Sequence, residues 1–260
     1  MNTELVSEAA EALLGAYGGD APVDPPSETY PDLTLDEAYA VQLTQVDSWL
    51  SGGRTVVGHK VGLTSRAMQE LLGVSEPDYG HLLDDFFHPE HMPIPVDLFV
   101  QPRIEPEIGF ILGQSLVGPG LTEADVRPAV AAVVPALEIV DSRIRDWKIG
   151  LLDTIADNAS SGAFVLGDAR APLSDLDLPS VECTLRLDDA VVGSGHGSAV
   201  MGNPLTALTW LANTVGARGV TLEAGHVVLP GALCAMVPVA AGDTFTATFA
   251  GLGSVTARFV

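Results

Sequence analysis

The spacing of apolar residues changes near residue 54, and this change constrains the fold more than any other feature of the sequence. In the first segment, Val6, Ala10 and Leu13 recur at helical spacing until Gly18 and Gly19 end the pattern. A proline-rich connection follows. Thr34 and Glu37 then form a capping box that begins a second helix. We therefore predict that residues 1–53 form an N-terminal helical arm. The stripe predicted to be buried on its second helix comprises Tyr39, Leu43, Val46 and Leu50.

After residue 54, short runs rich in β-branched residues alternate with glycine, proline and aspartate. Two helices are expected among them, one from the Thr122 cap to about Val133 and one from Asn203 to about Gly216. So few helices argue against a doubly wound parallel sheet. We predict an α+β protein whose residues 54–260 form one unit, a mixed β-roll. The expected strands span residues 55–61, 103–112, 135–140, 163–166, 181–187, 190–192, 227–229, 235–239, 244–249 and 255–260.

Composition excludes several classes of partner. The 260 residues include 34 acidic and 12 basic residues, a formal net charge of −22. Nucleic acid and anionic membranes need clustered lysine and arginine, so neither is expected as a partner. Cys183 and Cys234 are too few for a disulfide scaffold. No apolar run is long enough to span a membrane, and the acidic N-terminus does not resemble a secretory signal, so we expect a globular cytoplasmic protein.

Three glutamates are the strongest chemical signal. Glu105 and Glu107 alternate with Ile104 and Ile108, so in a strand the two acids share one face. Glu138 lies in a second, otherwise apolar run, where an acid without a partner is costly to bury. Carboxylates converging from two strands would suit Mg²⁺ or Mn²⁺, which prefer oxygen ligands. The alternative is two solvated acids on an edge strand and an unrelated, salt-bridged Glu138.

Pro106 separates the two neighbouring acids. Because proline donates no hydrogen bond to a sheet, we expect an edge strand or a bulge at this position.

Lys60 and Asp78 are further candidates. Lys60 interrupts an apolar strand, where a partly buried lysine can anchor an anion or transfer protons. It could equally extend to solvent from the end of the strand. Asp78 falls in a turn-rich stretch, residues 75–80, a kind of segment that often carries function, although a turn-capping aspartate is the simpler interpretation.

Taken together, these segments resemble the 2-keto-4-pentenoate hydratase group of the fumarylacetoacetate hydrolase superfamily. The resemblance runs in order from about Tyr30 to the C-terminus. The stretches that carry it are Gly58–Ser65, Glu76–Gly80, Pro102–Phe110, Pro135–Arg143, Asp146–Lys148, Asp153–Ser161 and Gly251–Val255.

The resemblance implies a mixed β-roll core, bound Mg²⁺ or Mn²⁺, and a role in the meta-cleavage breakdown of aromatic compounds. It also implies a homo-oligomer and, as a further option, a complex with other enzymes of the pathway. It makes Glu105, Glu107 and Glu138 metal ligands and gives Lys60 and Asp78 catalytic and substrate-binding roles. The substrate-binding residues that it adds are Asn158, Ser160 and Ser161.

Two activities share this scaffold, hydration of vinylpyruvate-type substrates and decarboxylation of 4-oxalocrotonate-type substrates. Residues 141–148, 194–198 and 231–233 look like those of the hydratases. Residues 30–40 and 75–85 look closer to the hydratases that act on seven-carbon dicarboxylates, but the extra loop of those enzymes is missing after Ser142. The expected reaction is therefore hydration of 2-hydroxypenta-2,4-dienoate to 4-hydroxy-2-oxopentanoate. A decarboxylase, a hydratase of a longer dicarboxylic dienoate and a non-catalytic partner in a pathway complex are the alternatives.

Overall fold

The computed structural model describes residues 1–65, 69, 74 and 76–260, so Ser75 of the predicted turn lies outside the described residues. The described helices are α1 (Thr3–Tyr17), α2 (Pro26–Thr29), α3 (Leu35–Ser51), α5 (Glu123–Val126), α6 (Leu151–Ala156) and α7 (Pro204–Gly216). The strands are β1 (Val56–Gly62), β2 (Asp78–Leu83), β3 (Phe87–Pro89), β4 (Arg103–Leu112), β5 (Val130–Val140), β6 (Ser161–Leu166), β7 (Glu182–Leu187), β8 (Ala190–His196), β9 (Val227–Leu229), β10 (Val237–Pro238), β11 (Thr244–Phe249) and β12 (Gly253–Arg258).

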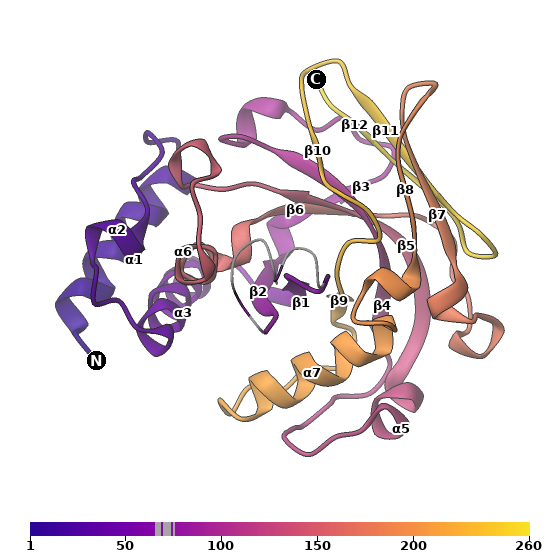
Figure 1. Cartoon of the computed structure of the whole chain (residues 1–260), viewed down its shortest axis with the longest axis horizontal. Coiled ribbons are helices and arrows are strands. Elements are labelled where there is room, and N and C mark those ends of the chain that lie inside the picture. The colour runs from indigo at the N-terminus through magenta and orange to yellow at the C-terminus, as the bar shows by residue number, and fades with distance from the viewer. Residues whose placement is uncertain (66–68, 70–73, 75) are drawn as a thin grey trace.

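Helices α1, α2 and α3 lie together on one side of the molecule (Figure 1). The predicted capping box at Thr34 is present at the start of α3. The predicted buried stripe is wrong in part, because Leu50 is 43% exposed while Gln42 and Gln45 are fully buried. Their Nε2 groups donate hydrogen bonds to backbone carbonyls, which offsets part of the cost of burial, while both Oε1 atoms lack a partner among the described residues. The division into an arm of residues 1–53 and a core of residues 54–260 stays a prediction.

The larger sheet of the described chain has the strand order β2-β1-β9-β4-β5-β6-β3, with β10 also paired to β4. Strands β4 and β5 pair antiparallel along almost their whole length, while β9 is parallel to β1. The sheet is strongly curled rather than flat (Figure 1). This curl brings strands that are distant in the sequence onto one concave surface.

A second sheet has the order β12-β11-β7-β8, and the predicted turn at Asp188-Asp189 joins β7 to β8. Its inner residues Phe245, Phe249 and Val255 are buried in the same core cluster as Ile104 and Ile108 of β4. Two sheets that share this apolar cluster, together with the helices, confirm the predicted α+β class and the mixed β-roll.

One predicted helix is shorter than expected, and two elements were not predicted. The helix from Thr122 ends at Val126, because Pro128 follows at once and Val130 already begins β5. The short helix α6 and strand β2 were not predicted, because both are too short to show a clear period.

Pro106 lies inside β4, and the ladder to β5 shows no register shift there. The other side of the strand faces a gap between β9 and β10, where Leu233 donates to the carbonyl of Pro106. Strand β4 is therefore neither an edge strand of the sheet nor bulged at Pro106, and the proline is tolerated because it lies at this gap in the strand pairing. Among the described helices, none is long and apolar enough to cross a membrane.

Candidate metal centre and active site

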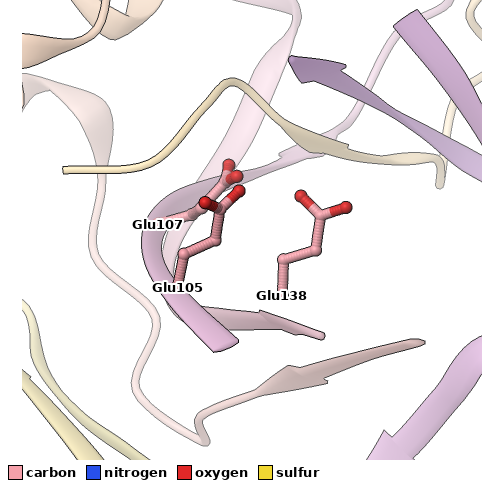
Figure 2. A group of neighbouring side chains, drawn as sticks. All are labelled: Glu105, Glu107 and Glu138. Atoms are coloured by element: carbon pink, nitrogen blue, oxygen red, sulfur yellow. The ribbon is translucent and has the colours of Figure 1, made fainter. Parts of the chain in front are cut away.

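Two neighbouring strands bring three carboxylates together. Glu105 and Glu107 project from β4, and Glu138 on β5 stands opposite Glu105 in the ladder. One carboxylate oxygen from each of the three lies within 4.8 Å of the others. Figure 2 shows the two β4 side chains side by side, with the carboxylate of Glu138 at the same level beside them. The two strands thus form a cluster of the kind expected for a divalent cation.

The cluster is buried and rich in oxygens that lack partners. Glu107 and Glu138 are fully buried, and Glu105 is half-buried. Glu107 Oε2 accepts a hydrogen bond from the backbone N–H of Gly231, at 2.7 Å. Among the described residues, Glu107 Oε1 and Glu138 Oε2 have no hydrogen-bond partner. Buried polar atoms are normally paired, so these orphaned oxygens fit an oxygen-preferring cation such as Mg²⁺.

Burial raises the pKa of all three glutamates, that of Glu105 to about 8, and their mutual repulsion adds to the effect for Glu105 and Glu107. The positive charge of Lys60 acts in the opposite direction. A cluster that resists ionisation in the absence of metal becomes fully ionised when a cation supplies the missing charge.

Lys60 of β1 lies across the concave surface from β5. Its Nζ is 3.2 Å from Glu138 Oε1, and both side chains are almost completely buried. Burial lowers the pKa of Lys60, but the surrounding carboxylates, with Glu138 foremost, outweigh burial and hold that pKa above its usual value. Lys60 is therefore a protonated, hydrogen-bonding cation, and it does not extend to solvent.

Asp78 begins strand β2 directly opposite Gly62 of β1, so it lies in a strand and not in the predicted turn. Its Oδ2 accepts a hydrogen bond from Thr154 Oγ1 at 3.1 Å. Its Oδ1 is buried with no hydrogen-bond partner among the described residues. Burial raises the pKa of Asp78, while Lys60 lowers it, and the net effect is a rise. A carboxyl group with a raised pKa and one free oxygen can both accept and donate a proton.

The predicted substrate-binding residues lie in a tight turn before β6. Asn158, Ala159 and Ser160 all adopt positive φ angles of 51–52°, a backbone conformation that is costly outside glycine. The side chain of Asn158 binds both the N–H and the carbonyl of His81, and Ser161 Oγ donates to the carbonyl of Asn158. In the structure these groups hold the turn against β2, and contact with a substrate stays a prediction for Asn158, Ser160 and Ser161.

The profile of the family described as fumarylacetoacetate (FAA) hydrolase C-terminal matches residues 73–260. The chain belongs to the fumarylacetoacetate hydrolase family. This match confirms the resemblance to that superfamily inferred from the sequence, and with it the expected class of fold.

Relatives within the fumarylacetoacetate hydrolase family align along the whole chain. A 2-keto-4-pentenoate hydratase of Paraburkholderia xenovorans (strain LB400) is 45% identical over 259 residues, which cover 100% of this chain and 96% of the relative. A 2-hydroxyhexa-2,4-dienoate hydratase of Comamonas testosteroni is 39% identical, with 98% of each chain covered. These similarities confirm that the protein is an enzyme of the lyase class.

One solved structure of the family matches nearly all of this fold. The 4-oxalocrotonate decarboxylase from Pseudomonas putida G7, complexed with magnesium and adipate, superposes with a TM-score of 0.96 at 36% identity, covering 100% of this chain and 99% of that one. A protein with this fold thus binds a divalent cation.

Two residues that contribute to the site, Gly231 and Thr154, were given no role there from the sequence. Gly231 is adjacent to a proline, a sign of a turn, but nothing local shows that its N–H reaches Glu107. At φ +127°, and packed against Thr64, it occupies a position that suits only glycine. Thr154 lies on the unpredicted helix α6. Both residues depend on contacts distant in sequence, which periodicity cannot show.

Proposed function

We propose that this protein is a divalent-metal-dependent hydratase that converts 2-hydroxypenta-2,4-dienoate (2-keto-4-pentenoate) to 4-hydroxy-2-oxopentanoate. One observation carries the proposal. Three clustered glutamates, two of them fully buried with oxygens that lack hydrogen-bond partners, lie beside Lys60 and Asp78. They belong to a chain aligned end to end with relatives named as 2-keto-4-pentenoate hydratases.

Glu105, Glu107 and Glu138 would hold the cation, with Mg²⁺ the first choice and Mn²⁺ the second. When bound, it supplies Lewis acidity that favours negative charge on the 2-oxygen of the substrate. The backbone N–H of Gly231 keeps Glu107 oriented by holding its Oε2, and this leaves Oε1 free for the ion.

The proton transfers of the reaction define what the side chains must do. The 2-hydroxyl loses its proton and C5 gains one, which gives the conjugated 2-oxo-3-enoate. Water then adds, its oxygen to C4 and a proton to C3. We assign these transfers to Asp78, whose buried carboxyl has one free oxygen and a raised pKa. Lys60, held protonated beside Glu138, donates hydrogen bonds to developing negative charge on the substrate.

A 4-oxalocrotonate-type decarboxylase is the second candidate, because the solved decarboxylase shares the whole fold. Stabilised charge on the 2-oxygen would serve loss of CO₂ equally well. The hydratase-like segment 141–148 and the greater identity to the named hydratases favour hydration. The proposal extends to a homo-oligomer in the cytoplasm that takes part in meta-cleavage catabolism, alone or in a complex with its pathway partners.

The test is a turnover assay on enzymatically generated 2-hydroxypenta-2,4-dienoate and on 2-oxo-3-hexenedioate, each with Mg²⁺, with Mn²⁺ and with excess chelator. We expect loss of the dienoate absorbance, 4-hydroxy-2-oxopentanoate as product, and no turnover with chelator. Release of CO₂ from the dicarboxylate at a higher kcat/KM than hydration of the dienoate would overturn the assignment. Calorimetric titration with Mg²⁺ would separate either enzyme from a non-catalytic partner, which needs no specific metal site.

A further inference from the structure

The carboxyl group of Asp78 is held in one orientation by residues outside the metal cluster. We propose that Thr154 and Gln42 are positioning residues of this active site. Thr154 would fix which oxygen of Asp78 is free, and Gln42 would fix the spacing of the two elements that carry the Asp78–Thr154 pair. The inference rests on the proposed role of Asp78 in proton transfer.

Thr154 makes the two oxygens of Asp78 unequal. Its hydroxyl donates to Oδ2, and Thr154 and Asp78 are both buried. Oδ1 lies against Gly62, where a Cβ atom would collide with it. Gly62 and Lys60 are two residues apart on β1 and so share one face of that strand. Thr154 therefore directs the free oxygen of Asp78 to the face that carries Lys60.

Gln42 ties together the two backbones that bear this pair. From helix α3, its Nε2 donates to the carbonyl of Tyr79 at 3.0 Å and to the carbonyl of Ile155 at 2.8 Å. Tyr79 directly follows Asp78, and Ile155 directly follows Thr154. One buried amide thus sets the separation of β2 from α6 at the residues next to the Asp78–Thr154 hydrogen bond.

Helix α6 needs such support. It has six residues, fewer than an isolated helix requires for stability in water. Its first turn is held by Asp153, which accepts hydrogen bonds from the N–H and the hydroxyl of Ser27. Its end is held by Gln45, whose Nε2 donates to the carbonyl of Ala156 at 2.7 Å. Gln45 docks the same helix as Gln42 but makes no bond to β2, so it is a matched control.

The first experiment compares Thr154→Val and Thr154→Ser in the full chain with saturating Mg²⁺. Valine keeps the shape and removes the donor, while serine keeps the donor. We expect Thr154→Val to lower kcat by about 10- to 100-fold, the cost of a misplaced catalytic group, with KM changed less than threefold. Thr154→Ser should recover most of kcat. The Kd for Mg²⁺, measured by calorimetry, should stay within about twofold of the wild-type value in both variants.

The second experiment compares Gln42→Met with Gln45→Met. Each variant loses an amide that docks α3 on α6, so both should lower the melting temperature. Only Gln42→Met should also lower kcat, by about tenfold, with KM and the Kd for Mg²⁺ nearly unchanged. Equal kcat losses in the two variants would show that docking of the helical arm, and not the spacing at Asp78, is what matters, and would overturn the role of Gln42.

Crystal structures of the wild type and of Thr154→Val with Mg²⁺ provide a readout that does not depend on turnover. We expect the Asp78 carboxyl group to rotate in the variant and Oδ1 to leave its place against Gly62. Unchanged kcat in Thr154→Val, or an unchanged Asp78 rotamer, overturns the role of Thr154. If the wild type fails to hydrate the dienoate, the proposed function fails, and the rotamer alone then decides whether Thr154 positions Asp78.

Discussion

The molecule buries two clusters of charge, and they are built in opposite ways. At the candidate metal centre, Lys60 is the one cation of the described cluster, and it faces Glu105, Glu107, Glu138 and Asp78. In the second cluster, Arg143 lies between Asp141 and Asp157, with its Nε 2.7 Å from Asp157 Oδ1. Both clusters are buried, so burial alone does not distinguish them.

Hydrogen bonding distinguishes them. Every nitrogen and oxygen atom of the Arg143, Asp141 and Asp157 side chains has a partner in the described chain, including backbone N–H groups of Val100 and Gln101. The guanidinium also stacks on Tyr17, 4.0 Å from the ring centre. Three of the carboxylates at the metal centre keep oxygens without hydrogen-bond partners. A closed network stabilises a fold, whereas an open one is suited to a ligand.

The largest effect is expected from breaking the closed network. Arg143→Met leaves two carboxylates buried without their cation, which should lower the free energy of unfolding by about 3–5 kcal/mol. Denaturant unfolding measures this. The matched control is Arg145→Met, because Arg145 pairs with Asp24 at the surface and should contribute less than about 1 kcal/mol. Similar losses in the two variants would refute the distinction.

Removing one carboxylate from the metal centre should affect catalysis rather than folding. Glu107→Gln keeps the volume of the side chain but removes a ligand charge. We expect kcat/KM to fall roughly 10³-fold, together with loss of calorimetric Mg²⁺ binding. The metal-free variant should be at least as stable as the wild type, because repulsion is relieved. Glu182→Gln, at an exposed position on β7, is the control. Normal Mg²⁺ binding and turnover in Glu107→Gln would disprove the site.

A pair of buried histidines differs from both charged clusters, because burial favours their neutral form. The rings of His59 and His81 lie with their centres 4.8 Å apart, tilted by 53°, and burial lowers the pKa of His81 to about 4. The unfolded chain, with a histidine pKa near 6.5, takes up the proton first as the pH falls. The contribution of neutral His81 to stability should therefore be complete above pH 6.5 and be lost between pH 6.5 and 4, about 3 kcal/mol in all.

Urea unfolding across that pH range tests the histidine pair. His81→Gln should flatten the pH dependence, whereas His196→Gln, at an exposed position, should leave it unchanged. If the free energy of unfolding changes with pH in His81→Gln as it does in the wild type, His81 does not contribute to the loss of stability in acid.

The smallest expected effect is the stabilisation of the wild-type protein by added Mg²⁺. Mg²⁺ at about 100 times its Kd should stabilise the protein by about 2.7 kcal/mol, because the ion binds only the folded site. Thermal unfolding with and without Mg²⁺ measures the shift, which Glu138→Gln should abolish and Arg145→Met should retain. An equal shift in Glu138→Gln would place the stabilising ion elsewhere.

Much of the fold follows from local patterns. The capping box at Thr34, the Asn203-Pro204 helix start and the Asp188-Asp189 turn all appear where predicted, because each is determined within a few residues. Predictions that needed distant partners were less accurate. The buried face of α3 carries Gln42 and Gln45, and their burial depends on carbonyls more than 30 residues away.

The candidate site shows the same division between what local sequence determines and what distant contacts determine. Strand alternation by itself placed Glu105 and Glu107 on one face, since side-chain direction in a strand is a local property of the backbone. Only the tertiary structure decided that Glu138, Lys60 and Asp78 meet them. That meeting depends on strand order and on the curl of the sheet, which the packing of the whole core determines. The sequence determined which side chains could act together, and the curled sheet determined which of them do.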